Sequence, residues 1–322
     1  MRSDKWQVTS GKWLIACCVL LAAGCSTTKP ARVVNPEIAA FADLARDAYD
    51  RSAFEQSARL YARALAKARA ADDALEIGNN AYNMAACLIA LERYSEAREP
   101  LREARREFER IGTEVSAAEL LDAKAARLEG KQDEAQQIAN QVLGELKPGK
   151  NPAYRAQAMI VRAQIACDRR DADAARAELS AAQKEMKKLK NPYLAAAIFG
   201  VNGRIALIEK EPAKAAAEFD SEADLCRDAG KYRDMAMALG RAGQAYADAD
   251  NAAAAADRFH RAARSFFAQG DELASLKMIE SALKSAEKAG DKAALLRTTS
   301  LFEEIKKQME ASKPAGSGEA KP

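Results

Sequence analysis

The sequence has few of the residues from which catalytic and metal sites are usually built. Its 322 residues include one histidine and six cysteines. No two cysteines have the spacing of a zinc site, and no G-x-S-x-G, H-E-x-x-H or C-x-x-C motif follows Cys25. His260 comes directly after Phe259 in a helical segment, where a packing role is expected. We therefore expect no enzymatic activity, no metal and no cofactor.

One near-match to a nucleotide-binding motif does not change this expectation. Residues 144–151 read G-x-x-x-x-G-K-N. A phosphate-binding loop needs Ser or Thr where Asn151 stands, and it follows a β-strand. The preceding segment has a helical pattern instead, so we interpret residues 148–152 as a turn between helices.

The composition also argues against a β-sheet and against nucleic acid. Runs of β-branched residues are scarce, and aromatic residues make up only 6% of the chain. The formal net charge of +3 is too small to indicate a basic patch. Alanine is abundant, and 30% of the residues are charged. This composition fits closely packed helices with solvated outer faces.

A helical hairpin is clearest at residues 239–259, LGRAGQAYADADNAAAAADRF. Leu239, Gly243 and Tyr246 follow one another at helical spacing. Ala255 and Phe259 do so again after the breaker-rich DADN. Large residues would then face small ones, so two helices could approach closely.

The same pattern recurs along the chain at steps of 38 to 40 residues. The position of Gly243 is taken in the other copies by Ala45, Ala85, Ala123, Ala163, Gly203 and Leu283. The small residue of the second helix recurs as Ser57, Ala97, Ala135, Ala175, Ala215 and Ala255. The bulky residue four later is Tyr61, Leu101, Ala139, Leu179, Phe219 and Phe259. Turn signals at Asp72, Gly112, Gly149, Asn191, Gly230 and Gly270 keep the same period. These series share one period and stay in phase with one another, which predicts a repeat array.

The pattern L-x2-A-G-x2-Y-x8-A-x3-F at residues 239–259, with a second copy at 81–101, resembles the tetratricopeptide repeat (TPR) family. The resemblance covers residues 37–310, with a period of 40 residues rather than the usual ~34. The third, fifth and seventh copies match the signature poorly. The resemblance implies an all-α fold, an α-solenoid of about seven TPR-like helical hairpins in a right-handed superhelix. It implies a scaffold rather than a chemistry.

The N-terminus resembles that of a bacterial lipoprotein precursor. Residues 13–24 are apolar but too few to span a bilayer, which takes about 20 residues. Residues 21–25, LAAGC, resemble a lipobox, whose cysteine is lipidated and becomes the mature N-terminus. An ordinary signal peptide or an uncleaved anchor is the alternative. The expected organisation is a signal peptide at 1–24, lipidated Cys25 with a tether at 25–36, the solenoid at 37–310 and a disordered tail at 311–322.

Ser26, rather than Asp, follows the expected lipidation site. In lipoproteins of this type that residue favours the outer membrane, so we expect a lipid-anchored protein that faces the periplasm. The inner membrane is the alternative. The remaining cysteines, Cys87, Cys167 and Cys226, are an odd number on distant repeats, and we expect them to be small buried hydrophobic residues.

The resemblance also implies that the first helix of each hairpin lines a concave groove. The residue after the small residue would point into this groove, and neighbouring residues would extend it. The candidates for partner binding are Arg46, Tyr49, Asn79, Tyr82, Asn83, Lys124, Arg127, Gln157, Gln164, Arg204, Gln244 and Lys284. Long polar side chains and tyrosines suit an extended, somewhat acidic polypeptide. The alternative is that these good helix formers are merely solvated.

These features together predict a membrane-anchored periplasmic lipoprotein that acts as a scaffold or adaptor for a cell-envelope complex of assembly, secretion or pilus type. Its partners would be an envelope protein, with an extended segment in the groove, and the membrane, through the lipid; we expect no nucleic acid. The alternative is a sensor that holds a small molecule or a peptide in the groove, which an enclosed apolar pocket would indicate.

Overall fold

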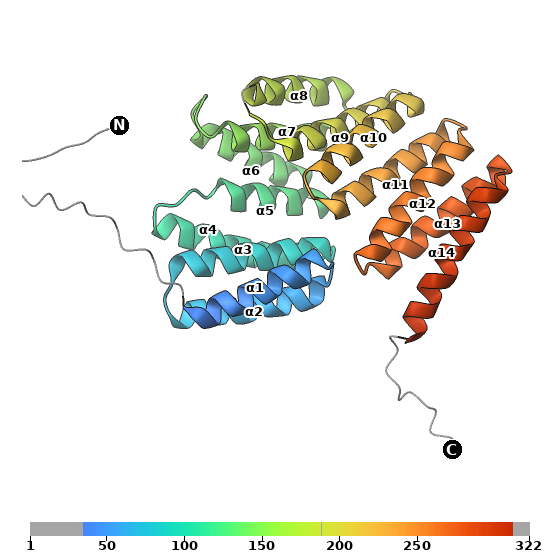
Figure 1. The fold of residues 1–322 in the computed structure, drawn as a ribbon. Helices are drawn as coiled ribbons and strands as arrows, with labels where there is room; N and C mark the ends of the chain where they lie inside the picture. Colours follow the sequence, from blue (N-terminus) through green and yellow to red (C-terminus); the bar gives the residue numbers. More distant parts are fainter. Residues whose placement is uncertain (1–34, 188, 312–322) are drawn as a thin grey trace, which may run out of the picture. The chain divides into compact units, whose positions relative to one another are not determined.

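The computed structural model describes residues 35–187 and 189–311, and this part of the chain is folded into α-helices without strands. Fourteen helices follow one another as seven antiparallel hairpins (Figure 1). Their bounds are α1 (Pro36–Asp50), α2 (Phe54–Ala70), α3 (Ala74–Ala90), α4 (Tyr94–Arg110), α5 (Ser116–Leu128), α6 (Gln132–Glu145), α7 (Pro152–Asp168), α8 (Ala172–Met186), α9 (Pro192–Ile208), α10 (Pro212–Asp228), α11 (Tyr232–Asp248), α12 (Ala252–Ala268), α13 (Glu272–Ala289) and α14 (Lys292–Ala311). The prediction of an all-α solenoid of seven hairpins is confirmed. The expected signal peptide, Cys25 and most of the expected tether and tail lie outside the described residues.

Short polar residues mark where many of the helices begin. Their side-chain oxygens accept a backbone N–H of the first turn, which would otherwise lack a partner. The residues that do so are Asn35, Asp73, Asp171, Asn191, Asn251, Asp271 and Asp291. Proline, which has no N–H to leave unpaired, begins α1, α7, α9 and α10.

Most helices end in the same backbone turn. At the end of α10, for example, Gly230 has a φ of 68°, and the next N–H, of Lys231, donates to the carbonyl of Cys226 at 2.8 Å. This bond satisfies a carbonyl of the last helical turn. Because the backbone alone closes the turn, the geometry is kept although the turn sequences differ.

The hairpin core pairs small residues with large ones, as the repeat pattern predicts. A Cβ atom added to Gly203 would lie 2.6 Å from the Phe219 ring, and one added to Gly243 would lie 2.9 Å from the Phe259 ring. Real atoms do not approach so closely, so only glycine allows these helix contacts. In the first hairpin Ala45 packs in one cluster with Tyr61. The predicted alternation of small and bulky side chains is confirmed.

The third hairpin departs from the others. Its helices α5 and α6 have 13 and 14 residues, whereas α7, α9 and α11 have 17 each. Its bulky position is Ala139, which packs on Ala123 and Ala135. An alanine–alanine contact buries less apolar surface than a phenylalanine–glycine contact. Between α4 and this hairpin, polar contacts add to the apolar cluster of Leu101 with Ala125.

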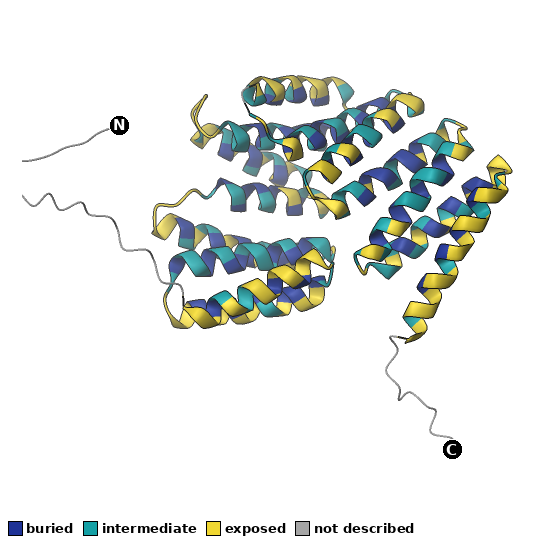
Figure 2. Ribbon diagram, viewed as in Figure 1, coloured by how far each residue is buried: buried dark blue, intermediate teal, exposed yellow. Residues whose placement is uncertain are grey.

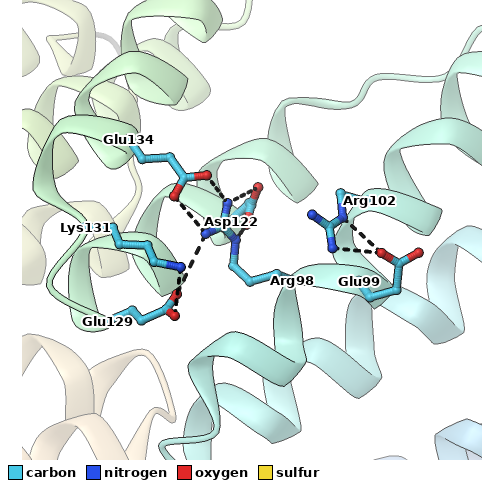
Figure 3. Close-up of polar contacts among 7 residues, drawn as sticks. All are labelled: Arg98, Glu99, Arg102, Asp122, Glu129, Lys131 and Glu134. Atoms are coloured by element: carbon cyan, nitrogen blue, oxygen red, sulfur yellow. Dashed lines mark hydrogen bonds and ion pairs between the residues drawn. The ribbon is translucent and has the colours of Figure 1, made fainter.

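Arg98 provides those contacts (Figure 3). Its largely buried side chain reaches from α4 to Asp122 of α5, to Glu134 of α6 at 2.7 Å, and to Glu129 at 3.8 Å. The side chain of Arg98 is only 11% exposed. One cation thus holds three carboxylates from the next hairpin.

Ion pairs connect successive hairpins elsewhere at the period of the repeat. They join residues 36 to 38 positions apart in Arg93–Glu55, Arg110–Asp72, Arg169–Asp133, Arg204–Asp168, Arg233–Asp271, Arg258–Asp220 and Lys288–Asp250. Pairs that are well exposed contribute little stability. Their regular spacing nonetheless favours a single register between neighbouring hairpins.

Buried residues lie where the helices face one another, and exposed residues cover the outward sides (Figure 2). The buried set is dominated by alanine. Cys87, Cys167 and Cys226 are buried and form no disulfide, as expected from the sequence. No helix in the described part of the chain is long and apolar enough to cross a bilayer.

Candidate functional site

The candidates for partner binding all lie on the first helices of the hairpins. They are distributed over α1 (Arg46, Tyr49), α3 (Asn79, Tyr82, Asn83), α5 (Lys124, Arg127), α7 (Gln157, Gln164), α9 (Arg204), α11 (Gln244) and α13 (Lys284). Each is exposed or partly exposed. Their role in binding stays a prediction, and the lipidation site Cys25 lies outside the described residues.

Two of the candidate arginines share one carboxylate. Arg127 of α5 and Arg204 of α9 both bind Asp168 of α7, at 2.9 Å and 2.5 Å. Arg204 also donates to the carbonyl of Gln164 at 3.4 Å. One carboxylate thus binds two guanidinium groups, so the three side chains together keep one positive charge in excess. This shared pair connects three consecutive hairpins.

Lys124 is different. Its side chain is exposed, and it forms no ion pair with any residue that the structure describes. Desolvation nevertheless lowers the pKa of its ammonium group; Asp234 acts in the opposite direction, and Arg127 adds to the lowering. The surrounding protein therefore shields this ammonium group from part of the solvent, although the side chain is exposed.

Two tyrosines are likewise exposed in part and shielded in part by the surrounding protein. Tyr49 and Tyr193 are 38% and 41% exposed, yet burial raises the pKa of Tyr49 to about 12 and also raises the pKa of Tyr193. The charge of Asp234 contributes to both shifts, and Tyr82 lies within electrostatic reach of both phenols. We call Tyr49, Tyr82, Lys124, Tyr193 and Asp234 the inner cluster. These residues lie on α1, α3, α5, α9 and α11.

The first hairpin contacts the sixth through Arg233, at the start of α11. The guanidinium carbon of Arg233 lies 4.7 Å from the ring centroid of Phe54 in α2 and 5.7 Å from that of Phe266 in α12. The same guanidinium binds Asp271 at 2.5 Å. A cation over an aromatic face is attracted by the ring quadrupole. We call this contact the Arg233 clasp.

A pocket of about 520 Å³ lies beside the clasp. It is lined by residues of α11, α12 and α13, and by Glu92 in the turn between α3 and α4. Its apolar lining includes Met237, Met278 and Leu273. The volume and the mixture of an apolar lining with a few polar groups are typical of ligand-binding pockets.

Several of these residues were missed from the sequence, although the repeat register contains a signal for them. Tyr193, Arg233 and Leu273 each lie ten residues before the position of Gly203, Gly243 and Leu283 in their repeats. They therefore occupy one equivalent position at the start of a first helix. Met237 likewise corresponds to Asn79 and Gln157. Extending the groove by register would have found these positions, but not Glu92, which lies in a turn.

The histidine and the cysteines of the described part, which are the side chains best suited to chemistry, pack against other residues. His260 is half-buried, with its Nδ1 atom 3.2 Å from the Thr298 hydroxyl, and burial lowers the pKa of its ring. Burial raises the pKa of the Cys87 thiol to about 11, which disfavours the reactive thiolate. Among the described residues no group of three or more His, Cys, Asp or Glu is arranged to hold a metal ion.

The sequence matches no protein-family model and no curated protein. Similar solved structures share the fold at low sequence identity. A Rap protein complexed with Competence and Sporulation Factor has a TM-score of 0.58 and 14% identity, over 85% of this chain and 88% of that chain. BtubC (BKLC) from P. vanneervenii has a TM-score of 0.53 and 17% identity, over 72% of this chain and 97% of that one.

A third similar structure is a signal-transduction ATPase with a tetratricopeptide repeat sensor from Pyrococcus horikoshii. It has a TM-score of 0.56 and 13% identity, over 81% of this chain. The match spans only 41% of that chain. Identities this low show the fold alone. The chain is thus a TPR-like helical repeat protein.

Proposed function

We propose that this protein is a scaffold that binds an extended segment of a partner protein across its inner cluster. The observation that carries the proposal is the combination of tyrosines and an uncompensated Lys124 on a water-accessible but enclosed surface. Tyrosine supplies large contact area at a low entropic cost, and such rigid aromatic residues are frequent at binding hot spots. The absence of a catalytic motif in the sequence also supports binding rather than an enzymatic role.

The proposal also includes a location. We propose that Cys25 carries the lipid, that residues 26–35 tether the repeats, and that the protein faces the periplasm from the outer membrane. The support is the sequence of residues 13–26: a short apolar run, LAAGC, and then Ser26. Several acyl chains on one cysteine anchor a protein stably, whereas one chain binds weakly. The partner would accordingly be a component of a cell-envelope complex.

Site-specific photo-crosslinking tests the binding surface. A photoreactive phenylalanine analogue placed at Tyr49 or Tyr193 should crosslink one envelope protein in cells, because it replaces one aromatic ring by another. Tyr232, which is 55% exposed and lies outside the inner cluster, is the matched control position. Lys124→Glu should weaken the crosslink at both inner positions. Equal crosslinking from Tyr232, or none from the inner positions, contradicts the proposed surface.

Lipid labelling tests the anchor separately. Metabolic labelling with a palmitate analogue should modify the wild-type protein and not a Cys25→Ala variant. The same variant should leave the membrane fraction, whereas a Cys226→Ala variant should remain labelled and membrane-bound. Labelling that persists in Cys25→Ala would contradict the lipoprotein assignment and leave the binding surface unaffected.

The pocket beside the Arg233 clasp favours a second candidate function. A sensor that holds a small apolar molecule would use such a volume. A small apolar fluorophore, 8-anilinonaphthalene-1-sulfonate, should then bind with one-to-one stoichiometry and be displaced by the natural ligand in cell extracts. Weak, non-saturable fluorophore binding would count against this candidate.

A further inference from the structure

The pocket between α11 and α13 has an adaptable apolar lining. Met237 is 46% exposed and Leu273 is 72% exposed, so both leave apolar surface in water that an occupant could cover. Gly240 keeps the floor open, since a Cβ atom there would lie 3.1 Å from the Sδ atom of Met278. Methionine side chains can reshape around different occupants. The lining thus suits a bulky apolar side chain and does not specify one shape.

The charges around the pocket divide into compensated and uncompensated ones. Arg233 is bound to Asp271 at 2.5 Å, and Arg241 is bound to Glu222 at 2.8 Å. The remaining charged lining residues are Lys277 of α13 and Glu92 of the α3–α4 turn. Both are exposed, and neither forms an ion pair with any other residue between 35 and 311 that the structure describes. The pocket therefore offers one cation and one anion to an occupant.

We propose that this pocket anchors one bulky apolar side chain of an extended peptide, whose neighbouring acidic and basic residues pair with Lys277 and Glu92. The inference rests on the proposed function and names the chemistry of the bound segment. Charge complementarity of both signs favours a peptide, because a hydrocarbon ligand would leave both charged groups without partners. Each ion pair at an exposed rim adds modest affinity but a clear preference for the sign of the partner residue.

The experiment uses the full-length protein in detergent and a phage-displayed library of random linear peptides. Peptides selected on the wild type should share a Leu, Met or Phe with an acidic residue on one side and a basic residue on the other. Their affinities are then measured by fluorescence anisotropy for synthetic copies. The double variant Met237→Ser, Leu273→Ser should bind at least about tenfold more weakly, since removing apolar burial of about 1.4 kcal/mol has that effect. Leu296→Ser on α14 is the control, because Leu296 is equally exposed, at 75%, and lies outside the pocket.

Charge reversal provides the sharper test. Lys277→Glu should weaken a selected peptide several-fold, and replacing the acidic residue of the peptide by Lys should restore its affinity. Glu92→Lys should also weaken the peptide, and replacing the basic residue of the peptide by Glu should restore its affinity. Lys292→Glu, at the start of α14 and outside the lining, should leave the preference unchanged. A merely destabilised fold would not reverse its preference in this way.

Three outcomes would overturn the inference in distinguishable ways. If Tyr193→Ser weakens peptide binding and the pocket variants do not, the proposed function holds, but the pocket is not part of the binding surface. Failure to select any peptide would contradict the proposed function itself. Saturable binding of 8-anilinonaphthalene-1-sulfonate that the double pocket variant abolishes, and that selected peptides do not displace, would make the pocket a small-molecule site.

Discussion

At the scale of single residues, the turns store conformational strain. Hairpin turns require a left-handed residue, and several of these positions are occupied by residues with a side chain, including Ser52, Glu92, Arg170, Lys210 and Asp250, with φ between 57° and 64°. A left-handed conformation costs a residue with a Cβ atom roughly 1–2 kcal/mol. The folded protein tolerates this cost because the backbone hydrogen bond that closes the turn, together with the packing of the hairpin, holds the residue in this conformation.

Glycine at such a turn can be tested against glycine in a helix. Gly230 has a φ of 68° and no atom near its missing Cβ, whereas Gly144 lies inside α6, also without a neighbour there. Gly230→Ala should lower the free energy of unfolding by about 1 kcal/mol, because alanine is strained in the left-handed region. Gly144→Ala should raise it by about 0.5–1 kcal/mol through helix propensity. Urea denaturation measures both, and effects of the same sign would contradict the turn geometry.

A buried glutamate gives a second prediction at this scale. Glu119 is 3% exposed, one of its oxygens has no hydrogen-bond partner in the described structure, and Arg105 approaches only to 3.5 Å. Burial, and then the charge of Glu145, raises its pKa. A raised carboxyl pKa favours the protonated folded form, so the stabilising contribution is present in acid and is lost as pH rises through the folded-state pKa.

Glu119→Gln should therefore stabilise the protein at pH 7.5 by on the order of 1 kcal/mol, because the neutral amide carries no buried charge to desolvate. The advantage over wild type should shrink in acid, because the raised pKa of Glu119 lets its carboxyl group become protonated and neutral as well. Thermal denaturation at the two pH values measures the difference. Glu109→Gln is the control, since Glu109 binds the same arginine at 2.8 Å but is 47% exposed. If the stability advantage of Glu119→Gln over wild type grows in acid, the raised pKa of Glu119 is contradicted.

At the scale of secondary structure, the third hairpin is held to α4 by polar contacts as well as by apolar packing. Arg98 is central to the polar contacts, because it is largely buried and it compensates Asp122, whose side chain is 18% exposed. Burial raises the pKa of Asp122, and the Arg98 guanidinium opposes that shift. Removing the arginine leaves a partly buried carboxylate without its cation.

Arg98→Met should lower the free energy of unfolding by about 3 kcal/mol, the usual loss when one partner of a buried ion pair is removed. Adding Asp122→Leu should recover part of it, because no unpaired charge then remains. The control is Arg102→Met on the same helix, where an arginine that is 58% exposed pairs with Glu99 at 2.8 Å (Figure 3). That change should stay within about 0.5 kcal/mol, as judged from urea denaturation midpoints. Equal losses at the two sites would mean that Arg98 is no more than a surface pair.

At the scale of the described repeats, the Arg233 clasp connects residues that are far apart in sequence. Phe54 of the first hairpin lies under the guanidinium of Arg233 in the sixth, and a Cβ atom at Gly270 would lie 3.4 Å from the carbonyl of Arg51. Nearest-neighbour stacking of repeats does not require such a contact. The clasp brings the α1–α2 turn beside the pocket and next to the inner cluster.

A double-mutant cycle between Phe54→Leu and Arg233→Gln measures the clasp. A contact that persists in solution should give a coupling free energy of about 0.5–1 kcal/mol in thermal or urea unfolding. The matched cycle uses Arg241→Gln, another arginine of α11, whose guanidinium lies over Phe219 instead, at 5.4 Å. That second cycle should be additive. Additivity in both cycles would indicate that the first and sixth hairpins do not hold together in solution.

The sequence by itself determined the helices and their pairing within hairpins; its placement of binding residues on the first helices stays a prediction. These features follow from local spacing: the series through Gly243 and Phe259 repeats wherever a small residue must meet a large one, and caps and turns are read from neighbouring residues. Such short-range patterns survive in one sequence because each hairpin satisfies them independently.

Only the tertiary structure decided which of the groove candidates remain uncompensated and which residues join them. Arg127 and Arg204 share the carboxylate of Asp168, whereas Lys124 forms no ion pair with any described residue and has Asp234 within electrostatic reach. Glu92 and the Arg233 clasp depend on how hairpins far apart in sequence come together. That placement is the accumulated result of small rotations at each helix contact, and no local spacing encodes it.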